Sequence, residues 1–402
     1  MSRRDRTITA LDIGSAKTCA IVGEVVEDGV KFTALGASES KGLRKGQIVN
    51  LDAAVGSIRR AVEEAESAAG IPVEAALVGV AGSHVKGVTS RGGIPLGPRA
   101  RDVVRDDVRR AVEAARNISL PEDREILHVL PQEFFLDGHD SIRDPVGMSG
   151  QNLEAVVHLV TASALATQNL ITAVNRAGIV VTDTVLEPLA AAEACLTRDE
   201  RELGCCLVDI GGGTTEWIVF TAGVARHAGA VPVGGDHFSN DLAVGLRTPI
   251  PEAEKIKREY ACACREIQTE DAAIEIASMG DRPPRTVFTR MLCDIVEPRA
   301  QELMMLVFEQ LKRAGLDSQI PAGLVLAGGG AHLAGLTDLA ERLFQLPVRV
   351  AAPRGMAEVS HEATQPEYAT AVGLLLYGAR ARKSAAQKAG SIGARLKAMF
   401  AS

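Results

Sequence analysis

The sequence predicts an α/β protein that is built from two related halves. A segment beginning at Asp12 (DIGSAKTCAIV) and another beginning at Asp209 (DIGGGTTEWIV) share more than half of their residues at equivalent positions. Aromatic residues make up only 3% of the chain, against 46% hydrophobic residues in all, and there are 39 glycines. Ala, Val, Leu and Ile must therefore fill the core, which favours α/β layers over an aromatic-rich β-sandwich. The 402 residues are enough for two or three domains.

Composition and charge argue against several classes of protein. With 44 basic and 51 acidic side chains the chain has a net charge of −7, which argues against nucleic acid as a partner. The seven cysteines match no zinc-binding spacing, and with no apolar leader they indicate a reduced, cytoplasmic protein. No apolar run approaches the ~18–20 residues that a membrane span needs. Basic residues gather at one end, however, because six of them and no acid follow Ala379.

Three glycine-rich turns are candidates for binding phosphate. In the two related segments, one apolar run enters a Gly/Ser/Thr turn and a second leaves it, which predicts a strand–turn–strand unit. Backbone N–H groups in such a turn can approach an anion closely, and the leading Asp can hold a hydrated divalent cation. A third turn, between a buried strand and a helix over 336–344, suits packing against a nucleotide. The candidate residues are Asp12, Gly14, Ser15, Ala16, Lys17, Thr18, Asp209, Gly211, Gly212, Gly213, Thr214, Thr215, Gly328, Gly329, Gly330 and Ala331.

The order of these motifs resembles that of the actin, Hsp70 and sugar-kinase superfamily, whose members have two α/β domains flanking a nucleotide cleft. Within it, the chain is most similar to the FtsA family of bacterial cell-division proteins, over nearly its whole length. Chance similarity between two ordinary hairpins is the alternative. The more specific stretches are HVLPQEFFLDG at 128–138, DPVGMSGQNLEAVVHLVT at 144–161, LEPLAAAEACL at 186–196, PEAEKIKREY at 251–260 and IVEPRAQEL at 295–303.

The resemblance implies an actin-like, ribonuclease H-like duplicated ATPase fold with an inserted subdomain of the type called 1C. In the family this subdomain serves self-association and contact with later division proteins; the alternative is a passive insertion. The implied parts are domain 1A (1–82, 162–204 and about 367–378), an SHS2-like subdomain 1C (83–161), domain 2A (205–247 and 295–366), a largely helical subdomain 2B (248–294), a linker (379–390) and an amphipathic helix (391–402).

ATP with Mg²⁺ is the cofactor that the resemblance implies. The turns would supply N–H donors, Lys17 would supply a point charge to the β- and γ-phosphates, and Asp12 and Asp209 would hold Mg²⁺ through water. Glu187, just before Pro188 at a helix start, would order water near the γ-phosphate, or else only complement the helix dipole. By resemblance Glu254 and Lys257 lie beside the adenine and ribose; without it, they belong to a solvated helix face. At most slow hydrolysis is expected, with the nucleotide acting as a switch for assembly.

The C-terminal segment predicts an interfacial amphipathic helix. Ser391 is a candidate N-cap, and apolar residues then recur on one face with basic residues toward the rest. Such a helix suits an anionic membrane surface, although it could instead dock on the protein's own body. The residues concerned are Ile392, Arg395, Leu396, Lys397, Met399 and Phe400.

The partners also follow from the resemblance. The family's main partner is the tubulin-like protein FtsZ, whose acidic C-terminal peptide would dock on 248–294, where Arg285 and the nearby Arg299 could bind its carboxylates. The expected function is an actin-like filament protein that tethers FtsZ to the cytoplasmic face of the inner membrane at the division site. A pilus-assembly ATP-binding protein of the PilM type is one alternative. A sugar kinase or exopolyphosphatase is another, but no motif for a sugar-pocket Asp base is found.

Overall fold

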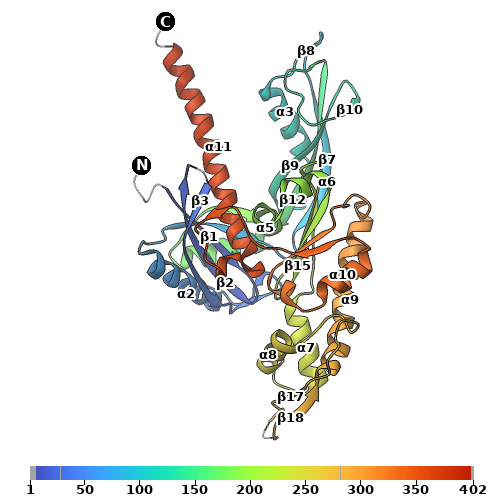
Figure 1. The fold of residues 1–402 in the computed structure, drawn as a ribbon. Helices are drawn as coiled ribbons and strands as arrows, with labels where there is room; N and C mark the ends of the chain where they lie inside the picture. The colour runs from blue at the N-terminus through green and yellow to red at the C-terminus, as the bar shows by residue number, and fades with distance from the viewer. Residues whose placement is uncertain (1–5, 28, 281, 400–402) are drawn as a thin grey trace.

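Two α/β halves lie side by side in the computed structural model, and a smaller unit projects from each (Figure 1). The structure describes residues 6–27, 29–280 and 282–399, with side chains through residue 384 apart from residue 140. A separate small sheet projects at one end of the molecule, and a region of helices with a short hairpin projects at the other.

The first half is built on a six-stranded sheet in the order β13-β6-β1-β2-β3-β21. Strands β1, β2 and β3 are antiparallel, whereas β6 and β13 run parallel to β1 and to each other. Helices α2 and α4 cover one face, and α5 and α11 cover the other. The strands are β1 (Thr7–Ile13), β2 (Lys17–Val26), β3 (Gly29–Glu39), β6 (Ala75–Val80), β13 (Val180–Leu186) and β21 (Met356–Ala357), and the helices are α2 (Leu51–Ala69), α4 (Ala164–Arg176), α5 (Glu187–Cys195) and α11 (Ala369–Met399).

The second half repeats this plan. Its sheet has the order β16-β15-β14-β19-β20, with the first three strands antiparallel and β19 and β20 parallel to β14. Its own core is closed by α7, α8, α9 and α10. The elements are β14 (Cys205–Ile210), β15 (Thr215–Thr221), β16 (Val224–Val231), β19 (Leu324–Ala327), β20 (Val348–Val350), α6 (Arg198–Leu203), α7 (Gly235–Leu246), α8 (Ile250–Tyr260), α9 (Thr289–Arg313) and α10 (Leu336–Phe344), with 3₁₀ turns η1 (Gly329–His332), η2 (Glu362–Thr364) and η3 (Pro366–Tyr368).

Helix α5 packs between the two sheets because its side chains are small. Three consecutive alanines, Ala190–Ala192, are fully buried in a core shared by β1 of the first half and β14 of the second. Helix α11 crosses α5 so closely that a Cβ added at Gly373 would lie 1.9 Å from the carbonyl oxygen of Ala190. This packing fixes the N-terminus of α5, and therefore Glu187, at the junction of the two halves.

Each projecting unit has its own small sheet. Between β6 and α4, a four-stranded sheet in the order β10-β9-β12-β7 packs against α3, whose buried face includes Ala111 and Ala115. The expected helical region after α7 also contains the hairpin β17–β18, which the sequence pattern did not indicate. The bounds are β7 (Lys86–Pro95), β8 (Arg101–Asp102), α3 (Arg105–Arg116), β9 (Arg124–Leu136), β10 (His139–Ile142), β11 (Ser149–Gly150), β12 (Asn152–Ser163), β17 (Ala273–Ile276) and β18 (Arg285–Phe288).

The C-terminal segment differs from the prediction. A linker is expected at 379–390 and a separate helix from 391, but α11 runs without a break from Ala369 to Met399 and leads away from the body (Figure 1). The segment is rich in Ala, Lys and Arg, which are strong helix formers and offset the cost of its glycines. No helix in the described part of the chain is long and apolar enough to cross a membrane. The side chains of Ile392, Arg395, Leu396, Lys397 and Met399 lie beyond the described ones, and Phe400 lies outside the described residues.

Candidate functional site

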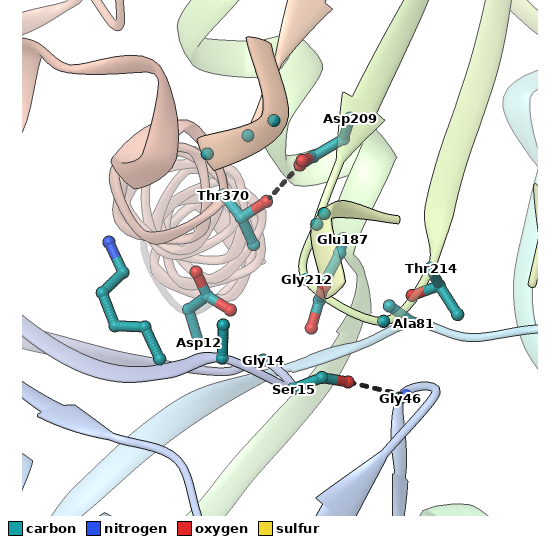
Figure 2. Close-up of a pocket in the computed structure, with 18 of the residues that line it drawn as sticks. Asp12, Gly14, Ser15, Gly46, Ala81, Glu187, Asp209, Gly212, Thr214 and Thr370 are labelled. Carbon is teal, nitrogen blue, oxygen red and sulfur yellow. Dashed lines mark hydrogen bonds between the residues drawn. The ribbon is translucent and has the colours of Figure 1, made fainter. Parts of the chain in front are cut away.

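A cavity of about 680 Å³ lies where the two halves meet, and most of the predicted binding residues line it. Both related hairpins and the glycine turn after β19 contribute to its wall, so segments far apart in the sequence share one site (Figure 2). The predicted residues that line it are Asp12, Gly14, Ser15, Ala16, Lys17, Glu187, Asp209, Gly211, Gly212, Gly213, Thr214, Glu254, Lys257, Gly328, Gly329 and Gly330.

Three predicted residues do not line the cavity. The hydroxyl of Thr215 donates to the carbonyl oxygen of Val233 at 2.8 Å, and the hydroxyl of Thr18 bonds Ser40 at 2.7 Å. Both threonines are fully buried, because side chains alternate along a strand and the neighbour takes the cavity side. Ala331 is buried in η1. Thr215 was a candidate phosphate-binding residue, but its hydroxyl is turned away from the cavity, whereas Thr214 lines it.

The two hairpin turns touch each other, and only glycine permits this approach. A Cβ added at Gly213 would lie 2.7 Å from the hydroxyl oxygen of Ser15, closer than real Cβ contacts come. At the third turn Gly328 has φ +78°, and a Cβ there would lie 2.3 Å from Oδ1 of Asp209. At these glycines backbone rather than side chain faces the cavity, which is the arrangement that an anion-binding cradle requires.

Four carboxylates gather in this site: Asp12, Asp209, Glu187 and Glu216. Burial raises the pKa of Asp12 to about 7, with Lys17 opposing the rise and Asp209 adding to it. Burial likewise raises the pKa of Asp209 to about 6, and the pKa of Glu187 lies well above its usual value because burial and the other three carboxylates disfavour its charge. Such a cluster is poised to accept a cation, since a positive ion would stabilise every charged form at once.

Glu216 is the carboxylate that sequence reasoning missed. Burial raises its pKa to about 8, and Oε1 of its carboxyl is buried without a hydrogen-bond partner. In the β14–β15 ladder Glu216 is the direct partner of Asp209, so the two side chains lie on one face of the sheet. Cys19 occupies the equivalent position of the first hairpin, opposite Asp12. An acid replacing a cysteine in a buried strand was the signal that could have found it.

The described residues fit a hydrated divalent cation better than a directly bound one. Among them, no group of three or more His, Cys, Asp or Glu side chains has the arrangement of a metal site. The carboxylates of Asp12 and Glu187 nevertheless point into the same space between the loops (Figure 2). Mg²⁺ usually keeps several waters and is held by one or two carboxylates together with phosphate. The donor set therefore suits an ion held through water.

Lys17 lines the cavity, but its ammonium group is already engaged. It donates to the carbonyl oxygen of Glu367 at 3.0 Å and lies 3.2 Å from the centroid of the Tyr368 ring. Burial lowers its pKa. The predicted phosphate-binding charge is thus turned toward η3 rather than held free, and Glu367 and Tyr368 are further lining residues that the sequence did not indicate.

At the α8 side of the cavity, Glu254 and Lys257 form a partly buried polar cluster rather than a solvated helix face. Lys257 bonds Oε2 of Glu254 at 2.6 Å, the hydroxyl of Ser239 at 3.0 Å and the carbonyl oxygen of Gly235 at 3.1 Å. The bond from Lys257, one from the Ser239 hydroxyl and one from Arg258 at 2.6 Å hold the pKa of Glu254 below its usual value against the opposing effect of burial.

The two predicted partner arginines are occupied within the chain. Arg299 on α9 bonds Asp241 of α7 at 2.6 Å and also contacts Glu302. Arg285 on β18 donates to the carbonyl oxygen of Leu246. Neither guanidinium is free in this structure, so an acidic peptide would have to compete with these internal bonds.

The duplicated halves around a glycine-lined cavity define an actin-like protein. Solved structures with this fold include a PilM–PilN type IV pilus biogenesis complex, with a TM-score of 0.65 and 19% identity, covering 92% of this chain and 98% of that one. MreB5 of Spiroplasma citri bound to ADP has a TM-score of 0.59 and 16% identity, covering 94% and 98%. At these identities the likeness establishes the fold alone.

Comparison with known sequences identifies the family within the actin-like proteins to which this chain belongs. Residues 206–373 match the model of the cell division protein FtsA, and residues 82–161 match that of the SHS2 domain inserted in FtsA. The FtsA of Pseudomonas aeruginosa is 44% identical, with 93% of this chain and 89% of that protein covered. The FtsA of Escherichia coli is 37% identical, with 93% and 90% covered. The chain belongs to the FtsA family of cell division proteins.

Proposed function

We propose that this chain is an ATP-binding, actin-like cell-division protein that polymerises and tethers FtsZ to the membrane. The observation that carries the nucleotide part is the cavity itself, in which three glycine-rich turns meet four buried carboxylates. Solved relatives of the same fold include MreB5 of Spiroplasma citri bound to ADP and to AMPPNP. Family membership favours this function over pilus assembly or sugar phosphorylation, the two alternatives that the fold alone leaves open.

The residues present fit Mg-ATP in the following way. The turns at Gly14–Ala16 and Gly211–Gly213 offer backbone to the phosphates, and Asp12 and Asp209 would hold Mg²⁺ through water. Bound Mg²⁺ would neutralise phosphate charge and so stabilise the charge that develops during phosphoryl transfer. The base would lie between α8 and the turn after β19, beside Glu254 and Lys257.

Glu187 and Glu216 are the groups available to orient or deprotonate water. Burial raises the pKa of both carboxyls, so either could act as a base near neutral pH only once a bound cation lowers that pKa again. No other element of a hydrolytic machine, such as a free arginine, lines the described cavity. Binding with slow turnover is therefore the expected behaviour, with the nucleotide controlling assembly.

Membrane attachment is proposed for the C-terminal segment. Six basic residues contribute at most ~1 kcal/mol each near an acidic leaflet, and several lie beyond a Debye length. The four apolar side chains expected on one face add about 1 kcal/mol each when partly inserted. One tail therefore binds weakly, and a filament of many copies binds firmly through avidity. The location that goes with this proposal is the cytoplasmic side of the inner membrane at the division site.

The proposed partners are assigned to the projecting units. The acidic C-terminal peptide of FtsZ would dock on 248–294, displacing the internal bonds of Arg285 or Arg299. The four-stranded sheet at 83–161 would contact later division proteins or a neighbouring copy in a filament. Nucleic acid is not expected as a partner, because the net charge is −7.

Two measurements test the proposal. Calorimetric titration of the full chain with Mg-AMPPNP should show binding with one site per chain, and absence of any binding would refute the nucleotide assignment. Co-sedimentation with vesicles containing anionic lipid should pellet the full chain, more strongly with Mg-ATP, but not a chain truncated after residue 385. If both chains pellet equally, the C-terminal segment is not the membrane anchor.

A further inference from the structure

Within the part of the chain that the structure describes, every Lys and Arg side chain that lines the cavity is already bonded to another residue. Among the described residues that line it, the Lys and Arg side chains are Lys17, Lys257 and Arg258. Lys17 is bonded to the carbonyl oxygen of Glu367, and Lys257 and Arg258 each bond Glu254 at 2.6 Å. A nucleoside triphosphate brings several negative charges into a site already rich in carboxylates. A positively charged side chain near the phosphates would add to the neutralisation that the proposed Mg²⁺ supplies.

The hairpin formed by β4 (Leu43–Arg44) and β5 (Gln47–Ile48) lies at that place. Its tip contacts both phosphate-loop candidates, because Gly46 N–H donates to the Ser15 hydroxyl at 3.1 Å (Figure 2). On the other side, a Cβ added at Gly213 would lie 3.0 Å from the backbone nitrogen of Lys45. Leu43, Gly46 and Ile48 line the cavity itself. The hairpin therefore closes the site where the first and second halves meet.

Lys45 sits at this tip in a conformation that its residue type disfavours. The two-residue loop Lys45–Gly46 has positive φ at both positions, +51° and +72°, the pattern of a type I′ turn. Asn, Asp or Gly is preferred at the first position, and a lysine there is disfavoured by its Cβ. The side chain is exposed, and within the described part of the chain its ammonium has neither a hydrogen-bond nor an ion-pair partner.

We infer that Lys45 binds the terminal phosphate of the nucleoside triphosphate and so distinguishes it from the diphosphate. The inference rests on the proposed function and deepens it. If the base lies against α8, the phosphate farthest from it is the one between the two loops, beside the hairpin tip. The four-carbon stem of a lysine carries a mobile point charge that can reach such a phosphate across the tip. A nucleoside diphosphate has no phosphate at that position, so Lys45 contributes little to its binding affinity.

The test compares Lys45→Asn with Arg44→Ala in the full chain. Asn-Gly is the preferred pair for this turn, so Lys45→Asn keeps the hairpin and is expected to raise the thermal midpoint slightly without nucleotide. Arg44→Ala removes the neighbouring exposed cation of the same hairpin and is the matched control. Calorimetric titrations with Mg-AMPPNP and with Mg-ADP give the affinities.

We expect Lys45→Asn to weaken Mg-AMPPNP binding about tenfold, as for loss of a charge-assisted bond, and to change Mg-ADP binding less than about twofold. Arg44→Ala should change both less than about twofold. Unchanged AMPPNP affinity, equal losses for both nucleotides, or an equal loss in the Arg44 variant would overturn the inference. Wild-type protein that binds neither nucleotide would overturn the proposed function instead, so the two failures are distinguishable.

Discussion

Thr370 donates a hydrogen bond of 2.9 Å to Oδ2 of Asp209, although the two residues are 161 positions apart. Asp209 is the last residue but one of β14, beside the cavity, and Thr370 lies in the first turn of α11. The same helix continues to Met399 and leads toward the C-terminal segment. We therefore expect any change in the charge of Asp209, such as one caused by a bound cation, to alter the strength of this hydrogen bond at the start of that helix.

Removing the Thr370 hydroxyl should destabilise the fold. Thr370→Val leaves a buried oxygen of Asp209 without its donor and should lower the free energy of unfolding by about 1–3 kcal/mol. The hydroxyl also opposes the rise in the pKa of Asp209, so that pKa should rise further in the variant. Urea unfolding at neutral pH measures the loss. Thr370→Ser keeps the donor, and a loss as large as that of Thr370→Val would contradict the explanation.

A second prediction concerns Glu187. Its carboxyl packs so closely on β6 that a Cβ added at Gly79 would lie 2.8 Å from it, which fixes its place in the site. Glu187→Gln keeps the shape and removes the cost of protonating a buried carboxyl on folding, so the nucleotide-free protein should be at least as stable as wild type at neutral pH. Single-turnover ATP hydrolysis should fall by about 10²–10⁴-fold while AMPPNP affinity changes little. Unchanged hydrolysis would show that another group orients the water.

The raised pKa of Glu216 predicts a pH dependence of stability. The folded protein keeps this proton up to a pKa of about 8, whereas the unfolded chain releases it near 4.5. The stabilising contribution is complete below pH 4.5 and is lost as the pH rises through 8, at up to about 1.4 kcal/mol per pH unit for one proton. Glu216→Gln avoids that loss.

Urea unfolding from pH 5 to 8.5 therefore should show Glu216→Gln becoming more stable relative to wild type as the pH rises. Glu63→Gln, the same chemical change on the exposed face of α2, is the matched control. A stability difference that stays constant over this range for Glu216→Gln would argue against a carboxyl that is neutral in the folded state.

Comparing two glycines separates the cost of a strained backbone conformation from the cost of a steric clash. One is Gly328, in the site, and the other is Gly70, at the end of α2. Gly70 has φ +67° and nothing within 4 Å of an added Cβ, whereas at Gly328, with φ +78°, the Cβ would lie 2.3 Å from Asp209. Gly70→Ala should cost about 1–2 kcal/mol of unfolding free energy, from conformation alone. Gly328→Ala should cost about 1–3 kcal/mol more and should also weaken AMPPNP binding. Equal losses of stability would mean that the turn can move away from Asp209.

The sequence was a good guide to segments whose function depends on local backbone. The glycine turns, the acids that begin each repeat and the helix start at Glu187 are local patterns, and the structure brings nearly all of them to one cavity. The actin-like fold is also confirmed, since two similar hairpins in one chain need similar surroundings. Local pattern likewise predicted α10 at 336–344 with the bounds observed.

Side-chain direction and partner choice were decided only by tertiary structure. The sequence could not show that Thr215 bonds Val233, or that Lys17 is held by Glu367, because those partners lie far along the chain or across a sheet. Nor could it separate an arginine free to bind a peptide from Arg299, which Asp241 already holds. The sequence alone thus determined which segments carry the chemistry. Packing determined which of their atoms face the cavity, because a buried polar group needs a hydrogen-bond partner and only the tertiary fold decides which partner is near.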